Sequence, residues 1–453
     1  MRSRRVVVLG GGPAGYAAAV RAAQRGAEVI LIERDELGGV CANRGCIPLK
    51  ALLHTSKLVA ALKTLEGRGI KLKGYEIDYK ALWRGKDSAV GRAVRGLKYL
   101  LERNGVEVVK GEGKLVGGLA VEVGGERVEG DGLIVATGSK PLRPAIPGLE
   151  EVEALDEEEA LDLRQAPERL LIVGGGPAGV ELATLFNGLG SEVYLVEKMS
   201  RLLPRMDAEL CRYLERYMRR RGVKVVTNAT VEKVRREGGK VVVHLSGHGK
   251  LEVDRIIFSV GRRPNSEGLG LEGVGVKVGD REEILVDGFM STNVPGIYAA
   301  GDVVGRYFLA YTAYFEGEVA AENALGGRTR ADYGHVPLAV FSEPEVASVG
   351  LREEEVRGLT GVRKGVSYFL ANGRAISSGM DEGLVKVLAD AKGRLLGVHI
   401  VGPEASELAC LASAIMKASG KLEALAEALY VHPTFSEALK EAALAALGRA
   451  LHA

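Results

Sequence analysis

A glycine-rich segment occurs twice in this chain, 164 residues apart, and this internal repeat constrains the fold more than any other feature. The copies span residues 6–15 and 170–179, and each is an apolar run followed by Gly-Gly-Gly-Pro-Ala-Gly. A helical pattern and a second apolar run follow in both copies, which is typical of the strand–helix–strand unit that binds a dinucleotide. One such motif is weak evidence. Two complete units predict two domains, each with a parallel sheet, and two different dinucleotides.

Three glycines and one acid carry the predicted chemistry of each unit. The first glycine allows a tight turn, the second lets the backbone approach a pyrophosphate, and the third lets helix and strand pack closely. The phosphates then meet the N-terminus of the helix. The acid, which ends the second strand, accepts hydrogen bonds from ribose hydroxyls. These residues are Gly10, Gly12, Gly15 and Glu33 in the first unit and Gly174, Gly176, Gly179 and Glu197 in the second.

Two cysteines, Cys41 and Cys46, follow the first unit and lie where a helix is predicted to begin. In an ideal helix, the Cα atoms of residues five apart are separated by roughly 8.7 Å. A disulfide tolerates at most about 7 Å between Cα atoms. Either these cysteines do not pair, or the helix is distorted between them, which Gly45 would permit. Two unrelated packing thiols are the simpler alternative, and the neighbouring dinucleotide unit argues against it.

Length and composition exclude several classes of protein. At 453 residues the chain is expected to form about three domains. Its net charge of +2 gives no sign of a nucleic-acid partner. Four cysteines do not make a secreted disulfide scaffold. The apolar run near the N-terminus is too short for a signal peptide, and no run approaches the roughly 18 apolar residues of a membrane span. We therefore expect a cytoplasmic protein without a membrane partner.

The remaining segments complete an α/β fold with two Rossmann-like domains and a C-terminal α+β domain. Helices are predicted over 51–66 and 88–104, short strands over 106–136, and a strand over 253–260. From about residue 333, strands at 339–341, 383–389 and 395–401 precede helices. The predicted boundaries are 1–143 for the first domain, 144–265 for the second, 266–333 for a second part of the first, and 334–453 for the C-terminal domain.

Two runs of charge are expected to be solvated ends of helices. The basic run 219–221 precedes a glycine, as at a helix C-terminus. The acidic run 156–159 reads as a helix start, where the helix dipole favours negative charge. Cys211 and Cys410 lie in predicted helices and are expected to be packing residues.

Further motifs occur in a fixed order along the chain, and the ordered set carries a family resemblance. They are Ala136-Thr137-Gly138, Gly261-Arg262-Arg263-Pro264-Asn265, Ala300-Gly301-Asp302, the segment 341–350 and the segment 432–437. Together with the two glycine motifs and the cysteine pair, they resemble the disulfide oxidoreductases that bind two dinucleotides. Within that group the resemblance is closest to the dihydrolipoamide dehydrogenases, and it covers nearly the whole chain.

The resemblance implies two cofactors, FAD and NAD. The first unit would hold FAD, with Glu33 on the adenosine ribose and Asp302 near the flavin. Ala136, Thr137 and Gly138 would also line this site, and Lys50 would pair with Glu181 beside the flavin. The second unit, closed by Gly261, would hold the nicotinamide dinucleotide. Glu197 favours NAD over NADP, because its carboxylate would repel a 2′-phosphate. No metal is expected.

The resemblance also implies a mechanism and partners. Cys41 would exchange with the substrate dithiol and Cys46 would pass electrons to the flavin, because thiolates attack disulfides. His432 would be the base, kept off a helix by Pro433, and Glu437 would orient its ring. The C-terminal domain would form a homodimer in which His432 reaches the partner's disulfide. The substrate would be a lipoyl-bearing carrier protein of a 2-oxo acid dehydrogenase or glycine cleavage system.

Three positions depart from the common pattern of these enzymes: Leu49, Pro177 and the pair Tyr311-Thr312.

Three alternative functions compete with the function of a dihydrolipoamide dehydrogenase. A glutathione-type reductase is disfavoured by Glu197. A mercuric reductase is disfavoured because its C-terminal cysteine pair is missing, since the last cysteine here is Cys410. A non-catalytic redox sensor is disfavoured by retention of both cysteines and His432. The other six histidines are expected to be structural or exposed.

Overall fold

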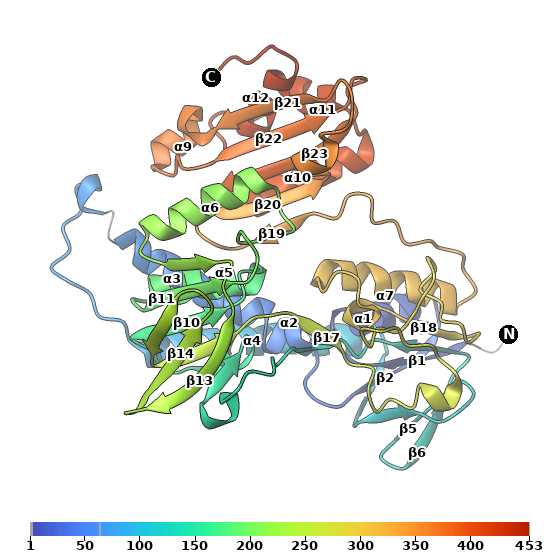
Figure 1. Cartoon of the computed structure of the whole chain (residues 1–453). Helices are drawn as coiled ribbons and strands as arrows, with labels where there is room; N and C mark the ends of the chain where they lie inside the picture. Colours follow the sequence, from blue (N-terminus) through green and yellow to red (C-terminus); the bar gives the residue numbers. More distant parts are fainter. Residues whose placement is uncertain (1–2, 63–64, 453) are drawn as a thin grey trace.

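The computed structural model describes residues 3–62 and 65–452. The chain folds into two lower lobes, each built on a parallel sheet, and an upper lobe built on an antiparallel sheet (Figure 1). We call them the first region, the second region and the C-terminal region. This arrangement confirms the predicted fold class.

The first region contains a five-stranded parallel sheet in the order β18-β7-β1-β2-β3. Four of its strands are largely apolar and buried on both faces, as parallel strands usually are, whereas the edge strand β3 is mostly exposed. One face packs against helices α1 and α7, and the other against a small antiparallel sheet of β4, β5 and β6. The bounds are β1 Arg5–Leu9, α1 Pro13–Gln24, β2 Glu28–Glu33, β3 Glu107–Lys110, β4 Gly113–Leu115, β5 Ala120–Val123, β6 Glu126–Glu129, β7 Gly132–Val135, β18 Ile297–Ala299 and α7 Ala310–Ala324.

The second region repeats this plan with a parallel sheet in the order β12-β11-β10-β16-β9 and a three-stranded antiparallel sheet of β13, β14 and β15. The bounds are β9 Ala154–Asp156, β10 Arg169–Val173, α5 Pro177–Gly188, β11 Glu192–Glu197, α6 Ala208–Arg220, β12 Lys224–Thr227, β13 Val231–Glu237, β14 Lys240–Leu245, β15 Gly249–Val253 and β16 Arg255–Phe258. The chain enters and leaves this region through β8 (Ser139–Pro141) and β17 (Arg262–Pro264), which pair antiparallel. The second region is thus inserted into the first, although the exact domain boundaries remain a prediction.

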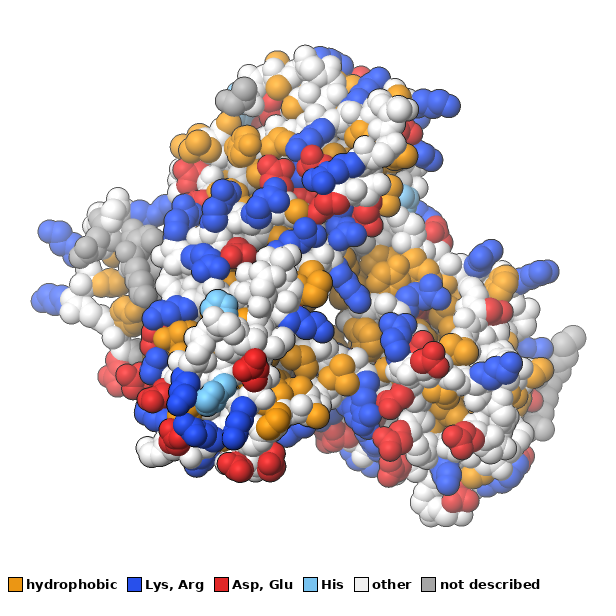
Figure 2. Space-filling model, viewed as in Figure 1, with side chains coloured by type: hydrophobic (Ala, Val, Ile, Leu, Met, Phe, Trp, Pro, Cys, Tyr) orange, Lys and Arg blue, Asp and Glu red, His pale blue; other side chains and the backbone are white. Residues whose placement is uncertain are grey.

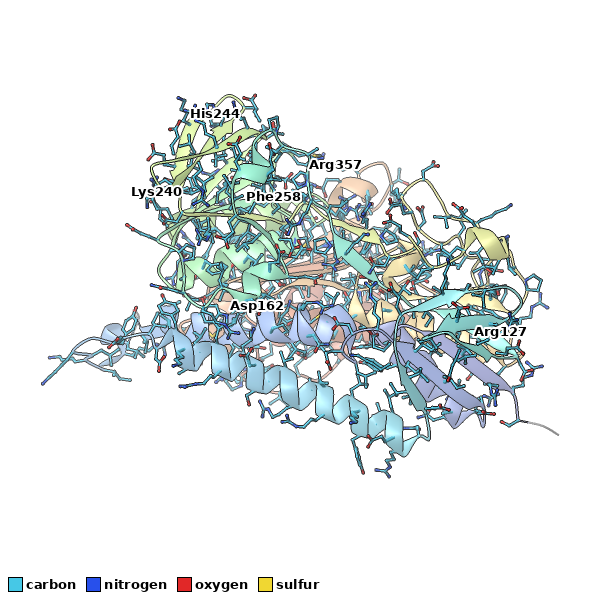
Figure 3. The ribbon with its side chains drawn as sticks, turned by 90° about the horizontal axis from the view of Figure 1, so that it is seen from below. Arg127, Asp162, Lys240, His244, Phe258 and Arg357 are labelled. Carbon is cyan, nitrogen blue, oxygen red and sulfur yellow. The ribbon has the colours of Figure 1, made fainter. Side chains whose placement is uncertain are left out.

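Helices α2 (Gly39–Asn43), α3 (Cys46–Leu62) and α4 (Tyr79–Arg103) connect the two lower lobes. In the view of Figure 3, α4 is the long helix along the lower edge of the molecule, running from the side of the second region toward the first region. The helix predicted over 88–104 begins earlier in the structure, at Tyr79. Asp78 caps its N-terminus by accepting a hydrogen bond from the Ala81 amide at 2.9 Å. The helix predicted over 51–66 also begins earlier and ends at Leu62, and its positions 63–64 lie outside the described residues.

The C-terminal region is an antiparallel sheet in the order β19-β20-β23-β22-β21, with its own core against α10, α11 and α12. The bounds are β19 Leu338–Val340, β20 Glu345–Gly350, α8 Glu353–Val356, β21 Arg363–Tyr368, α9 Gly373–Ser378, β22 Leu384–Ala389, β23 Leu395–Gly402, α10 Ala405–Ala418, α11 Leu422–Glu427 and α12 Glu437–Ala446. Short 3-10 helices occur at Glu66–Arg68, Leu149–Glu151, Glu159–Asp162 (η3), Glu272–Val274, Gly301–Val304 (η5) and Phe369–Ala371. Three of the five strands, β19, β22 and β23, lie where the sequence predicts them.

A buried lysine joins the C-terminal region to the second region. Lys386 on β22 is 0% exposed, and its Nζ donates to carboxylates of Asp207, Glu209 and Glu353 at 2.7, 2.9 and 2.7 Å. These three acids are also placed so that they could hold a cation, and the ammonium group occupies that position. At the surface of the same junction, acidic and basic side chains gather side by side (Figure 2).

Candidate active site

The helix carrying the two cysteines is interrupted between them. Helix α2 ends at Asn43 and α3 begins at Cys46, so Arg44 and Gly45 form a break. Of the two alternatives that the spacing left open, the structure shows the distorted helix. Cys41 and Cys46 are half-buried free thiols whose side chains hydrogen-bond to each other. The two thiols are therefore close enough for each to shift the pKa of the other and to act as a pair.

The environment makes the two thiols unequal. The hydrogen bond from Cys41, assisted by the nearby Lys50 cation and opposed by burial, lowers the pKa of Cys46 to about 7. The same hydrogen bond and burial raise the pKa of the Cys41 thiol. In the reduced pair, Cys46 is therefore the thiolate and Cys41 the thiol that donates to it.

The expected contact between Lys50 and Glu181 is present. Lys50 Nζ lies 2.7 Å from Glu181 Oε2, and Glu181 is almost fully buried on α5. The other carboxylate oxygen, Oε1, accepts a hydrogen bond from the Phe341 amide at 2.9 Å, and Lys50 Nζ stands 4.7 Å from the centre of the Phe341 ring. This contact joins the cysteine helix to both the second and the C-terminal regions. Motif 341–350 contributes this backbone donor, a role that the sequence does not reveal.

The two glycine turns have the geometry that a pyrophosphate requires. Gly10 and Gly174 adopt φ of +104° and +112°, which favour glycine. A Cβ on Gly15 would collide with the Gly10 carbonyl oxygen, and the second turn repeats this contact. Beside Gly12 the nearest atom to an added Cβ is the Gly39 Cα at 3.9 Å, and beside Gly176 nothing lies within 4 Å. The backbone at both second glycines is therefore open to a ligand.

The two strand-ending acids are held in the same way in both units. Glu33 accepts hydrogen bonds from the backbone amides of Gly11 at 2.6 Å and Asp35 at 2.7 Å. Glu197 accepts from the amides of Gly175 at 2.6 Å and Met199 at 2.7 Å. Each carboxylate thus lies next to its glycine turn, where a dinucleotide ribose would lie.

Asp302 lies in η5, directly after β18, with the Ala136-Thr137-Gly138 motif after the neighbouring strand β7. Its Oδ2 accepts a hydrogen bond from Ser139 Oγ at 2.6 Å, and burial raises the pKa of this carboxyl. The Asn265 amide donates to Gly138 O at 2.9 Å, and Thr137 Oγ1 donates to Asn265 O at 2.7 Å. Gly261 opens the neighbouring return segment with a φ of +119°. These motifs meet where the chain crosses between the two lower lobes.

His432 and Glu437 form the expected pair. His432 Nδ1 lies 2.9 Å from Glu437 Oε1, and Glu437 Oε2 accepts from the Thr434 amide at 2.8 Å. Figure 1 places α12, which Glu437 begins, in the upper lobe, and α2 between the lower lobes. One chain therefore does not bring His432 to its own cysteine pair. The His432 side chain is 75% exposed, and the neighbouring Leu429 and Val431 are 97% and 77% exposed.

Two expectations from the sequence are wrong. The acidic run 156–159 does precede a short helix, since η3 begins at Glu159, but the run is not solvated. The side chains of Glu157 and Glu158 are each 13% exposed and paired with Arg262, a partner that lies far away in the sequence. Cys410 is exposed on α10 instead of packing in the chain, whereas Cys211 is buried and burial raises its pKa to about 12. The basic run 219–221 does end a helix.

Two dinucleotide turns that flank one contacting pair of thiols define a class of protein, the disulfide oxidoreductases with two nucleotide sites. Residues 4–317 match the family model described as pyridine nucleotide-disulphide oxidoreductase, and residues 336–443 match the dimerisation domain of the same family. The chain belongs to the pyridine nucleotide-disulphide oxidoreductase family.

Relatives cover the whole length of the chain. A dihydrolipoyl dehydrogenase of Thermus scotoductus is 42% identical over 461 residues, covering 100% of this chain and 99% of the relative. A dihydrolipoyl dehydrogenase of Bacillus subtilis is 38% identical, covering 99% of this chain and 100% of the relative. Among solved structures, LpdA from Mycobacterium tuberculosis superposes with a TM-score of 0.91 at 30% identity, covering 97% of this chain and 99% of that one. In the part of the chain that the structure describes, no helix has both the length and the apolar character to cross a membrane.

Proposed function

We propose that this protein is a flavin-dependent disulfide oxidoreductase that oxidises protein-bound dihydrolipoamide to lipoamide with NAD⁺. The observation that carries the proposal is the contacting Cys41–Cys46 pair, held across a broken helix between a dinucleotide turn and the Lys50–Glu181 pair. Relatives named dihydrolipoyl dehydrogenase, which match the chain from end to end, support the choice of substrate.

The residues fit one FAD and one NAD. Gly10, Gly12, Gly15, Glu33 and Asp302 would hold FAD, and the equivalent glycines of the second turn with Glu197 would hold NAD. Both turns leave the backbone open at the second glycine, which is what a pyrophosphate needs. Held there, FAD would supply the two-electron chemistry that links the thiol pair to NAD⁺.

The residues of this chain account for the thiol steps. A substrate thiolate attacks Cys41 of the oxidised pair, which forms a mixed disulfide and releases Cys46 as a thiolate. The second substrate thiolate then displaces Cys41, so that lipoamide leaves with its disulfide closed and the pair is left reduced. Lys50 suits Cys46 to the leaving role: when Cys41 is in the mixed disulfide it can no longer donate a hydrogen bond, but the Lys50 cation still favours the Cys46 thiolate, and a stabilised thiolate leaves readily. The substrate dithiol gives up two protons. One of them ends on Cys41 and the other is taken by His432.

The family's dimerisation domain makes the protein a homodimer through its C-terminal region. We assign His432 to the disulfide of the partner subunit. Two observations support this assignment. His432 stands apart from its own cysteines, and the exposed apolar residues Leu429 and Val431 beside it need a covering surface. The lipoyl-bearing carrier protein and a cytoplasmic location remain predictions.

The test is a side-by-side assay of the purified holoenzyme. Free dihydrolipoamide with NAD⁺ should be turned over many times per second, while oxidised glutathione and Hg(II) with NADH should be poor substrates. Cys46→Ser should abolish lipoamide turnover, and Cys211→Ser, which changes a buried thiol on α6, is the matched control. Efficient reduction of glutathione or Hg(II) in place of lipoamide would replace this proposal with one of the two reductases. A yellow protein that turns over none of the three substrates would favour a redox sensor.

A further inference from the structure

A continuous series of hydrogen bonds connects the break between the two cysteines to the flavin-site carboxylate. Arg44, which lies in the break, donates through Nε to Glu158 Oε2 at 3.1 Å. Arg262 donates through Nη2 to Glu158 Oε1 at 2.6 Å and through Nε to Ser139 Oγ at 2.8 Å. Ser139 Oγ then donates to Asp302 Oδ2 at 2.6 Å. These five residues come from distant parts of the sequence, and no motif of the sequence analysis assigns a role to Arg44, Glu158 or Ser139.

The chemistry of arginine fixes the direction of this series. A guanidinium group only donates hydrogen bonds, so Ser139 Oγ must accept from Arg262. The single hydroxyl hydrogen of Ser139 is then directed at Asp302, in a short bond to a carboxylate oxygen. Among the described residues, no hydrogen bond reaches the other oxygen of Asp302, Oδ1. That oxygen is thus free to accept from a hydroxyl of a bound cofactor.

The positive charge of Arg262 favours the ionised form of the Asp302 side chain. Asp302 is buried, and burial works against its ionised form. The charged or titratable groups that face it are Arg262 on β17, Glu316 on α7 and Cys41 on α2, and only Arg262 favours a carboxylate. Arg262 is itself held by Glu157 and Glu158 at 2.9 and 2.6 Å, with its side chain 17% exposed.

We propose that Arg262 and Ser139 are positioning residues for FAD: they orient Asp302 and keep it ionised, so that its free oxygen accepts a hydrogen bond from a polyol hydroxyl of the bound cofactor. The inference rests on the proposed function, because it needs FAD in the first region. Arg262 would thus help to retain the cofactor, in addition to holding β17 against β8.

The test measures the release of FAD from the holoenzyme by flavin fluorescence on dilution, between pH 5 and 9. Ser139→Ala and Arg262→Met should each raise the dissociation constant for FAD about 10–100-fold, the usual worth of a hydrogen bond to a charged group. In both variants the pKa of Asp302 rises further, so the loss of FAD on acidification should begin at higher pH than in the wild type. Ser139→Thr keeps the hydroxyl and should restore both affinity and pH profile.

Two controls separate positioning from simple damage. Arg263→Met changes the neighbouring arginine, which pairs with Glu282 at 3.1 Å instead of Ser139, and should leave FAD release unchanged. In an Asp302→Asn background, Ser139→Ala should add no further loss, because the pair no longer acts through a carboxylate. Lower thermal stability of Ser139→Ala and Arg262→Met with wild-type affinity and pH profile would overturn the inference and leave the proposed function intact. A wild type that binds no FAD at all would instead overturn the proposed function.

Discussion

At the scale of single residues, the cysteine pair makes a prediction about pH. The pKa of Cys46 is lowered to about 7 by the Cys41 thiol and by Lys50, so in the reduced enzyme the thiolate forms as the pH rises through about 7. An ordinary thiol would titrate near 8.5. Thiolate absorbance in the ultraviolet, or the rate of alkylation between pH 5 and 10, measures this titration. Lys50→Met removes the cation and should move the midpoint to higher pH, whereas a midpoint near 8.5 in the wild type would contradict the assigned asymmetry.

Glu197 makes a second prediction at this scale. Its carboxylate lies beside the second glycine turn, where the 2′-phosphate of NADP would bring a like charge. The nearby Arg201 does not offset this, because it pairs with Glu354 at 3.2 Å and donates to Pro204 O. NADH should therefore exceed NADPH in kcat/KM by about tenfold or more, and Glu197→Gln should narrow the difference. Glu192→Gln, at the other end of β11, is the matched control. Equal use of both nucleotides by the wild type would remove this role of Glu197.

At the scale of elements, the sequence predicts the two repeated strand–turn–helix units. It does not predict the elements and pairings that are decided by contacts between distant parts of the chain. The two strand–turn–helix units are evident because each glycine has a local backbone reason, and the acid ends its strand at the same spacing. Strands β20 and β21 do not stand out, since a strand inside an antiparallel sheet is chosen by its neighbours as much as by its residues. The pairing of Glu157 and Glu158 with Arg262 is hidden for the same reason, because more than 100 residues separate the partners.

The break between α2 and α3 could be predicted only in part from the sequence. The five-residue spacing of the cysteines requires either a distorted helix or unpaired thiols, and local chemistry alone does not choose. In the structure the break falls at Arg44 and Gly45, between α2, whose Gly39 lies beside the Gly12 turn, and α3, whose Lys50 pairs with Glu181. Site residues that act through backbone geometry were thus predictable, and those that act through distant partners, such as Ser139, were not.

At the scale of the whole molecule, the buried Lys386 holds two regions together. Its three carboxylate partners come from α6, near its N-terminus, and from α8. Lys386→Met leaves the buried Asp207 carboxylate, which is 1% exposed, without its lysine partner, and breaking a buried ion pair typically costs about 3–5 kcal/mol. The variant should lose thermal stability by many degrees, as measured by calorimetry of the holoenzyme. Lys364→Met removes an exposed lysine that also pairs with Glu353, and should change little. Equal stabilities of the two variants would contradict the importance of the buried cluster.

The dimer makes the last prediction. His432→Gln should lower turnover by about 10²–10⁴, the usual worth of a positioned base. When this variant is dissociated and reassociated with Cys46→Ser, each mixed dimer contains one site with an intact cysteine pair and an intact His432 from the other chain. Activity should therefore reappear in verified mixed dimers. Mixed dimers without activity would mean that His432 serves its own chain or is not the base.

The two glycine turns share the same six residues, yet they differ in what stands over them. The first is overlain by α2, whose Gly39 Cα comes within 3.9 Å of where a Gly12 side chain would begin, while the second has open space beside Gly176. We therefore expect a nucleotide in the first turn to lie beside the start of α2 and to exchange more slowly than a nucleotide in the second turn, where no such neighbour stands beside Gly176. On that expectation, one peptide motif serves both a retained prosthetic group and a diffusible co-substrate, and the element beside the turn sets how long each stays bound.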